Sequence, residues 1–338
     1  MSRLFEGGMK TTAAERIIDF RPAWDRRGRR FFAETRKLML LEPVLLEKVW
    51  GGDRLARWFG GASAPAGTRV GEALLLHAHA GGSNRVASGP HAGGTLAEAL
   101  AAEPERMLGG GAGGECPLIC KLLHAGEGHL SVQVHPDASC AACGERAKEE
   151  AWYVIEALRE EPVVAGLSTS AAEFLLGGAR RRALRYLPAA PGDVFHIPSG
   201  AAHSLLAGTL VFEVSTVSET TLRLWDWDRR GRSVHPERAA KCIRPERTVA
   251  PVRGVEREDD DRAITAYELP FCRLLEVDLM GQWRLSRRGS FWFAAVLWGE
   301  LDVEGTALGR GAALFLPAED ECVIRAVSPA RLLVVIPR

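Results

Sequence analysis

Four side chains that can bind a metal ion occur at spacings that would bring them together. Gln133 and His135 stand two residues apart in an apolar run, so on a β-strand their side chains share one face. Glu150 and His203 follow on two further candidate strands. Two imidazoles, a carboxylate and an amide oxygen suit one Zn²⁺ with an open position for water or substrate, and Mn²⁺, Fe²⁺ and Co²⁺ remain alternatives.

Each of these residues also has a more ordinary explanation when it is taken alone. A single inward Gln on a strand is usually a hydrogen-bonded core residue, and a Glu beside a Lys usually lies at the surface. The metal hypothesis therefore rests on the four residues together and on the pattern around His203.

That pattern occurs twice in the chain and indicates two related β-units. Residues 192–203 read Gly, five residues, then Pro-x-Gly-x-x-His, and residues 311–322 keep the Gly-to-Pro spacing with Cys in place of the His. An aromatic strand precedes each copy. Internal similarity of this kind predicts two copies of one structural unit. We expect Ser290 and Cys322 to occupy the positions of Glu150 and His203, which leaves the second unit without metal ligands.

The first copy resembles the second sequence motif of the cupins, antiparallel barrels of the jelly-roll type. Frequent Gly-rich turns between short apolar runs also favour a sandwich or barrel. We predict a mainly β protein, a double cupin with a helical insertion. Its expected parts are an N-terminal extension (1–37), a catalytic metal-binding cupin with helical insertions (38–250) and a degenerate cupin without metal ligands (251–338).

Two segments of the first unit carry signals for helix starts. Thr95 can cap a helix that runs to Met107, and Ser170 can cap a helix over Ala171–Leu187, whose far end is basic. Ser and Thr are favoured at this position because their oxygens accept hydrogen bonds from the free N–H groups of the first turn.

Composition limits the classes of partner. Lys and Arg total 43 in the 338 residues, as do Asp and Glu, so no strong net field attracts nucleic acid or a membrane surface. No apolar run reaches the roughly 18 residues that cross a bilayer, and the first residues lack the apolar core of a signal peptide. We therefore expect a cytoplasmic protein with a small-molecule ligand, neither nucleic acid nor membrane; its oligomeric state is left open.

The cysteines do not suggest a disulfide framework. Their number, seven, is odd and they are spread along the chain, which fits a reducing compartment. Cys140 and Cys143 form a Cys-x-x-Cys pair that could be redox-active or half of a zinc site. No second pair follows at zinc-ribbon spacing, so we interpret them as small residues in an Ala-rich segment.

From about Pro43 to Ile243 the chain resembles the type I mannose-6-phosphate isomerases (phosphomannose isomerases). Six motifs in order carry the resemblance, and the C-terminal third matches only in architecture. They are Glu-Lys-Val-Trp-Gly-Gly (47–52), Pro-Leu-Ile-Cys-Lys-Leu-Leu (117–123), Ser-Val-Gln-Val-His-Pro (131–136), Lys-Glu-Glu-Ala-Trp-Tyr (148–153), Ile-Pro-Ser-Gly-Ala-Ala-His (197–203) and Thr-Thr-Leu-Arg-Leu-Trp-Asp-Trp-Asp-Arg (220–229).

The resemblance implies a role for each matching position. Arg223 corresponds to the family's active-site arginine, and Lys148, Lys121 and Ser131 match polar residues that line its sugar-phosphate pocket. The zinc ligands would be Gln133, His135, Glu150 and His203. Departures from the family pattern, at His124, Glu149 and Leu222, remove none of these ligands.

The implied reaction interconverts mannose 6-phosphate and fructose 6-phosphate by moving a proton between C1 and C2 through an enediolate. A metal can stabilise the developing charge as a Lewis acid, and Arg223 or Lys148 can add fixed positive charge. Lys121, Arg223 or Arg229-Arg230 could hold the phosphate. The sequence does not single out the base.

The ligand set also bears on two other classes of function. A cupin oxygenase would use redox-active iron, usually held by two His and one carboxylate, and Gln133 as a fourth ligand argues against it. A non-catalytic or differently specific sugar-binding cupin would be expected to lose metal ligands or Arg223, and all of these are present.

Overall fold

The computed structural model describes residues 37–60, 67–79, 82–110, 114–142, 144–286 and 289–338, with the backbone of 17–18. The predicted extension, 1–37, lies outside the described residues apart from 17–18 and 37. No helix in the described part of the chain is long and apolar enough to cross a membrane.

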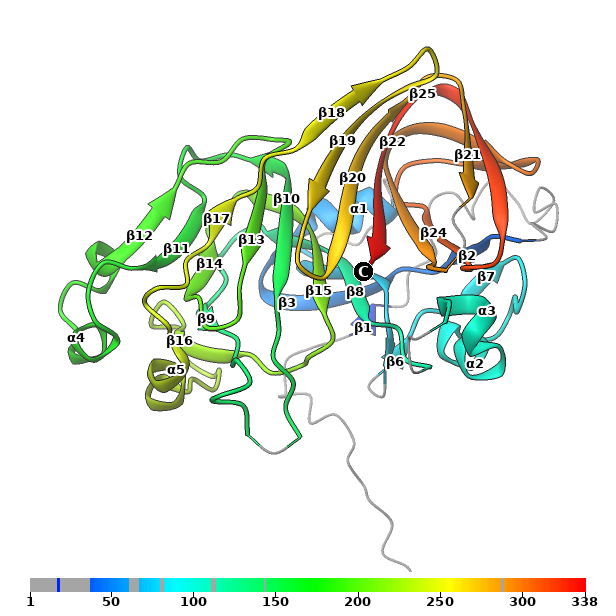
Figure 1. Cartoon of the computed structure of the whole chain (residues 1–338). Coiled ribbons are helices and arrows are strands. Elements are labelled where there is room, and N and C mark those ends of the chain that lie inside the picture. The colour runs from blue at the N-terminus through cyan, green and yellow to red at the C-terminus, as the bar shows by residue number, and fades with distance from the viewer. Residues whose placement is uncertain are drawn as a thin grey trace, which may run out of the picture.

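Two β-units lie side by side, joined by strands from the N-terminal part of the chain (Figure 1). The first unit consists of an eight-stranded sheet packed against a five-stranded sheet. In sheet order, the eight strands are β1 (Ile17–Ile18), β3 (Val44–Gly52), β4 (Val70–Leu76), β8 (Leu118–Ala125), β15 (Thr209–Thr216), β10 (Glu150–Ala157), β13 (Val194–Ile197) and β17 (Ala250–Pro251). The five are β12 (Leu184–Leu187), β11 (Val163–Leu167), β14 (His203–Leu205), β9 (Val132–Val134) and β16 (Leu222–Trp225).

The second unit is one ten-stranded sheet that curls into a barrel (Figure 1). Its order is β18 (Val255–Glu258), β19 (Arg262–Glu268), β20 (Cys272–Leu279), β25 (Glu321–Pro337), β22 (Trp292–Val303), β24 (Ala313–Leu316), β2 (Met39–Leu41) and β7 (Val86–Ser88), with β21 (Gln282–Ser286) beside β25 and β23 (Thr306–Leu308) beside β22. A separate hairpin joins β5 (Ala78–His79) to β6 (Gly82–Ser83). The predicted mainly β double cupin is confirmed.

Strand β10 is buried on both faces, and its alternation decides which residues enter the first barrel. Trp152 and Val154 belong to the core between the two sheets of the first unit. Ala151 and Tyr153 point the other way, into a core shared with the second unit. Because side chains alternate along a strand, Glu150 lies on the face of Trp152 and therefore inside the first barrel.

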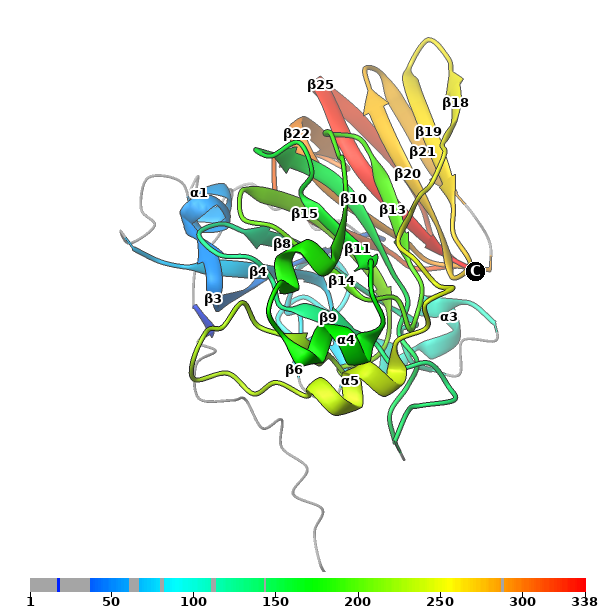
Figure 2. The ribbon, with the colours of Figure 1, turned by 90° about the vertical axis from the view of Figure 1, so that its left-hand side faces the viewer.

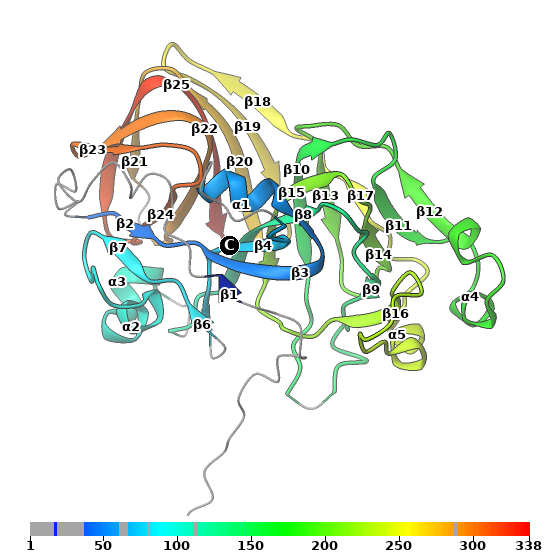
Figure 3. The ribbon, with the colours of Figure 1, turned by 180° about the vertical axis from the view of Figure 1, so that it is seen from behind.

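The two units do not divide cleanly at residue 250. Strand β2 pairs with β24, with Met39 opposite Phe315, and with β7 on its other side. Both β2 and β7 thus complete the sheet of the second unit although they precede the first barrel in sequence (Figure 3). The boundary predicted between 38–250 and 251–338 therefore crosses a continuous sheet.

The helices differ in part from the sequence prediction. Thr95 does cap α2 (Leu96–Ala102) with a reciprocal Glu98 contact, and α3 (Pro104–Leu108) continues to the predicted end after a break at Pro104. Three further α-helices in the described part of the chain are α1 (Asp53–Gly60), α4 (Ala171–Leu176) and α5 (Pro236–Cys242). Helices α4 and α5 cover the outer face of the five-stranded sheet (Figure 2).

The helix predicted over Ala171–Leu187 is wrong in length. Ser170 caps α4 as expected, but α4 covers only Ala171–Leu176. Gly177 and Gly178 follow with φ of 88° and 91°, a left-handed conformation that ends helices and that glycine adopts readily. The 3₁₀ turn η3 (Arg180–Ala183) then leads into β12, which pairs with β11.

The repeat forms the same hairpin in both units. The predicted alignment of Ser290 with Glu150, however, is wrong by two residues. Glu150 pairs with Ile197 in the first unit, and Leu316, which corresponds to Ile197 in the repeat, pairs with Trp292. Trp292, and not Ser290, thus occupies the position of Glu150. The error arose because aromatic residues alone do not fix the register of a strand.

The structure also joins Cys140 to Cys242 as a disulfide, with Cα atoms 5.7 Å apart and a sequence separation of 102. The cysteine count did not predict this pair. Cys143, the other member of the Cys-x-x-Cys run, lies outside the described residues. The disulfide ties the segment after β9 to the end of α5, beside an ion pair of Arg244 with Asp137 at 3.1 Å.

We predict that Cys242→Ser destabilises the oxidised protein by about 2–4 kcal/mol, the typical contribution of a disulfide that closes a long loop. Denaturant unfolding, with and without a reducing agent, measures this difference. The reduced variant should match the reduced wild type closely. An equal loss in both conditions would mean that Cys242 contributes by packing and not by cross-linking.

Candidate metal centre

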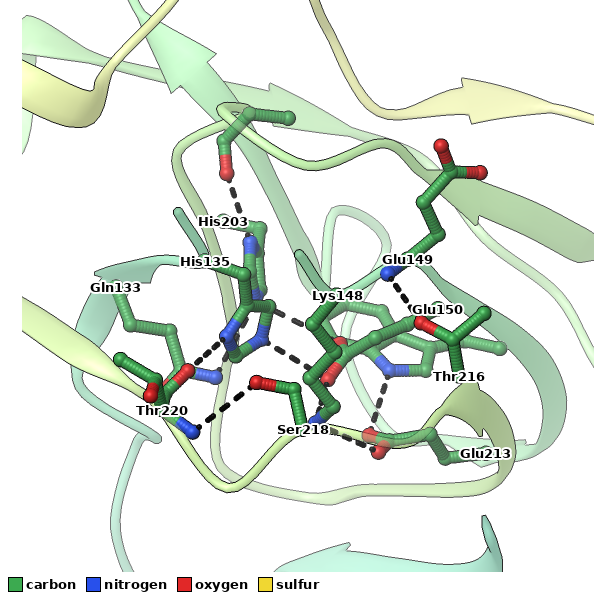
Figure 4. Close-up of polar contacts among 12 residues, drawn as sticks. Gln133, His135, Lys148, Glu149, Glu150, His203, Glu213, Thr216, Ser218 and Thr220 are labelled. Atoms are coloured by element: carbon green, nitrogen blue, oxygen red, sulfur yellow. Dashed lines mark hydrogen bonds and ion pairs between the residues drawn. The ribbon is translucent and has the colours of Figure 1, made fainter. Parts of the chain in front are cut away.

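Three potential metal ligands converge inside the first barrel, from three different strand segments. His135 follows β9, Glu150 begins β10 and His203 begins β14, and their ligand atoms all lie within 4.8 Å of one another (Figure 4). All three are at most 1% exposed. Gln133 lies directly opposite His203 in the sheet, with its Nε2 3.2 Å from the His203 Nε2. No other group of three such ligands occurs among the residues that the structure describes.

Backbone carbonyl groups fix the tautomer of both histidines. The Nδ1 of His135 lies 2.9 Å from the carbonyl oxygen of Thr220, and the Nδ1 of His203 lies 2.9 Å from that of Ala201. A carbonyl oxygen only accepts, so each Nδ1 carries the proton and each neutral ring presents the lone pair of Nε2 to the centre.

This arrangement leaves lone pairs facing one another. The His135 Nε2 lies 3.0 Å from Glu150 Oε1, and the His203 Nε2 lies 3.6 Å from Glu150 Oε2. The His135 Nε2 and Glu150 Oε2 are buried without a hydrogen-bond partner. Buried lone pairs repel one another unless a proton or a cation lies between them. The donor set therefore fits a divalent metal ion.

Charge around the centre keeps the donors in their binding forms. Burial alone would raise the pKa of Glu150, but the nearby positive charge of Lys148 holds it well below its usual range. The Lys148 Nζ donates to Glu150 Oε1 at 2.5 Å. Burial lowers the pKa of His203 to about 4, so its ring is neutral at pH 7.

A row of alternating charges crosses the eight-stranded sheet next to these ligands. It runs from Lys48 to Glu72 (3.4 Å), on to Lys121 (3.7 Å), then to Glu213 (3.3 Å) and to Lys148 (3.6 Å). Burial alone would raise the pKa of Glu72, but the lysines, Lys121 foremost, lower it to about 2. Each buried charge in the row thus has an opposite charge on a neighbouring strand.

Sequence reasoning missed three members of this row: Lys48, Glu72 and Glu213. A usable signal existed for the acids. Glu72 and Glu213 are the only charged residues in the mainly apolar strands β4 and β15, and a carboxylate at the centre of such a strand is buried only with a partner. Glu213 also accepts a hydrogen bond from the indole of Trp152 at 3.1 Å.

Two of the four predicted ligands, Gln133 and Glu150, line a cavity of about 430 Å³, whereas His135 and His203 lie behind its wall. Its lining also includes all four residues predicted to touch substrate or reacting atoms: Ser131, Lys121, Lys148 and Arg223. The Ser131 hydroxyl also donates to Gln133 Oε1 at 3.2 Å. The Nε of Arg223 is buried and makes no hydrogen bond among the described residues, so this guanidinium retains a donor for a ligand.

A different arginine from those predicted joins Arg223 in the cavity wall. Arg232 lines the cavity, held by the buried Asp226 through a contact of 2.9 Å. Arg229 instead binds Asp226 and the carbonyl oxygen of His129, and Arg230 is exposed; neither lines the cavity. The carboxylate of Glu149 points away from the centre (Figure 4). Its Oε2 lies 3.0 Å from the Nε2 of His196.

Comparison with known proteins agrees with this description. Residues 38–166 match the family model "Phosphomannose isomerase type I, catalytic domain". GmuF of Bacillus subtilis, named a probable mannose-6-phosphate isomerase, is 39% identical over 61% of this chain and 68% of its own length. The mannose-6-phosphate isomerase ManA of B. subtilis is 31% identical over 79% of this chain and 87% of its own. A crystal structure of the mannose 6-phosphate isomerase from B. subtilis has a TM-score of 0.79 at 29% identity, covering 89% of this chain and 99% of that one.

The two barrels define an enzyme of the cupin class, and among the residues that the structure describes the polar ligands converge in the first barrel alone. More narrowly, the chain belongs to the type I phosphomannose isomerase family and is an isomerase. The family resemblance read from the six motifs is thereby confirmed.

We predict one tightly bound zinc per chain, which His203→Ala removes. Loss of a ligand should weaken binding by at least the roughly 10–100-fold that loss of an outer-shell partner costs. Elemental analysis after dialysis measures the metal content. His196→Ala is the matched control, because His196 is a nearby histidine that contacts Glu149 away from the centre.

The second barrel should contribute no metal. Cys322→Ala, which changes the residue in the position of His203, should leave one equivalent of zinc in place. Two equivalents in the wild type, with one lost in Cys322→Ala, would contradict the assignment of a single centre.

Proposed function

We propose that the protein interconverts mannose 6-phosphate and fructose 6-phosphate with one zinc ion held by Gln133, His135, Glu150 and His203. The observation that carries the proposal is the set of buried, unsatisfied lone pairs at the edge of a cation-lined cavity. Zinc is favoured by the mixed nitrogen and oxygen donors. A mannose 6-phosphate isomerase of the same fold, with a TM-score of 0.68 at 16% identity, was crystallised with zinc bound.

Gln133 can serve as an oxygen ligand without a change in its surroundings. Its amide contacts the Ser131 hydroxyl on one side and His203 on the other. A hydroxyl both donates and accepts, so a half-turn of the amide keeps the Ser131 contact while Oε1 turns toward the histidines. Ser131 thus positions the ligand as well as lining the cavity.

A bound metal would supply Lewis-acid stabilisation of the negative charge that develops on a sugar oxygen during proton transfer. The chain adds fixed positive charge from Arg223 and Lys148, both in the cavity wall. These groups need little reorganisation, because Lys148 is held by Glu150 and Glu213 and the Arg223 strand by pairing with β9. Preorganised charge of this kind stabilises a transition state more than free water does.

The phosphate dianion needs its own cations. All three lysines that line the cavity belong to the alternating row, where each balances a carboxylate. Arg223, with an unsatisfied Nε, and Arg232, oriented by the buried Asp226, lie outside that row. Arginine binds phosphate in a two-pronged geometry, which supports these two residues as the phosphate-binding end of the cavity.

We expect turnover of mannose 6-phosphate that chelation abolishes and added Zn²⁺ restores. A coupled assay that detects fructose 6-phosphate measures it, with metal content determined on the same sample. Protein with full metal occupancy that binds the sugar phosphate without turnover would reject the isomerase and favour the sugar-binding alternative.

Arg223→Ala should lower kcat/KM by about 10²-fold or more, the scale of losing one charge-stabilising donor, at unchanged zinc content. Arg223→Lys, which keeps a point charge but loses the planar fork, should recover only part of the activity. Loss of zinc in Arg223→Ala, or kinetics near those of the wild type, would show that Arg223 has a different role.

A further inference from the structure

A second cavity, of about 710 Å³, lies on the first unit and shares no lining residue with the metal centre. We call it the arginine cavity. It is formed where the end of α4, the turn η3 and the segment after β16 meet. Its lining residues are Gly177, Gly178, Ala179, Arg180, Arg181, Arg182, Trp225 and Asp228.

The local backbone spreads three positive charges around this cavity. Arg180, Arg181 and Arg182 are consecutive in η3, and a 3₁₀ turn has three residues per turn, so their side chains leave in different directions. The preceding residues, Gly177 and Gly178, have no side chains that would fill the cavity. A side chain at Gly178 would meet no atom within 4 Å, so the backbone there borders open space.

Aromatic rings hold two of the guanidinium groups in place. Arg181 lies over the ring of Trp227 at 4.9 Å, and Arg180 lies near the ring of Trp225 at 6.0 Å. The two indoles pack on each other with centroids 4.5 Å apart, and Phe174 supports Trp225 from the side. Cations over aromatic faces lose little further freedom when they bind a ligand.

The positive charge of the cavity is not balanced. Asp228 is the only acid in its lining. Its Oδ1 accepts from the Trp225 indole at 2.9 Å and lies 3.5 Å from the Arg180 Nη1, while its side chain is 75% exposed. The Nε of Arg180 is buried and has no hydrogen-bond partner among the described residues. A buried donor without a partner is uncommon and indicates a missing acceptor.

We infer that the arginine cavity binds the phosphoryl group of a small phosphorylated molecule. Guanidinium groups match the oxygens of a phosphate in pairs, and the volume lies within the range of small-molecule sites. The three arginines meet at one cavity of a chain with no net charge, which favours a small ligand over a long polyanion. This inference does not rest on the proposed isomerase activity.

Isothermal titration with inorganic phosphate, in chloride buffer, tests the site without any need for turnover. We expect two phosphate-binding sites per chain in the wild type. Arg180→Gln should weaken the affinity of one of these sites for phosphate by on the order of 10-fold or more, the cost of a charge-assisted hydrogen bond. Arg185→Gln is the matched control, since it removes one exposed positive charge from the adjoining β12 outside the cavity lining.

A second variant, which is expected to strengthen phosphate binding, distinguishes a direct effect on the site from a loss of folding. Asp228→Asn removes the one negative charge of the lining and keeps an acceptor for Trp225, so phosphate should bind several-fold more tightly. One site of equal affinity in the wild type, Arg180→Gln and Asp228→Asn would overturn the inference. Parallel titrations with mannose 6-phosphate and a nucleoside diphosphate identify the class of ligand: the molecule that binds more tightly than free phosphate, with the same dependence on Arg180, is the occupant.

Discussion

The centre of the first barrel is organised around one constraint: the carboxylate of Glu150 is ionised and only 1% exposed. Taking such a group out of water costs several kcal/mol unless opposite charges and hydrogen bonds replace the solvent. Lys148 supplies the nearest charge, but it is itself buried and approaches a second acid, Glu213. Compensation therefore extends across the sheet, through Lys121 and Glu72 to Lys48. The order of strands β10, β15, β8, β4 and β3 brings these groups together, so the fold and the electrostatics of the centre depend on each other.

The second barrel shows what the same hairpin becomes without that constraint. Trp292 stands opposite Leu316 where Glu150 stands opposite Ile197. Cys322 pairs with Leu285 in place of the pairing of His203 with Gln133. These residues join an apolar core, and no charged row is required. The second unit also covers the outer face of β10, since Tyr153 packs in a core that includes Phe293 and Val335. Its contribution to the centre is thus to keep water away from the back of the strand that carries Glu150.

Features that depend on residues close in sequence could be predicted from the sequence, whereas contacts between remote residues could not. Gln133, His135 and His203 could be predicted to share the barrel interior because strand parity and the spacing of one motif are local properties. The charged row could not, because it requires the sheet order, which joins strands as far apart as β4 and β15. The length of α4 depended on two left-handed glycines, a local signal that the basic run after them obscured. The partners Cys140 and Cys242 are likewise remote in sequence and meet only because α5 packs beside β16.

Strand β16 contributes one residue to each of the two cavities. On a regular strand these two residues would share a face. Arg223 lines the metal cavity and Trp225 the arginine cavity, although side chains two apart on a regular strand point the same way. The register with β9 shifts between these two residues, and such a bulge redirects the following side chain. The turn beyond is strained, with Trp227 and Asp228 both at positive φ, 57° and 61°, and the buried Asp226 holds it through Arg229 and Arg232. Strain of this kind persists only where surrounding contacts over-determine it. The same carboxylate that holds this turn also orients Arg232 in the wall of the metal cavity, so Asp226 supports a wall of each cavity.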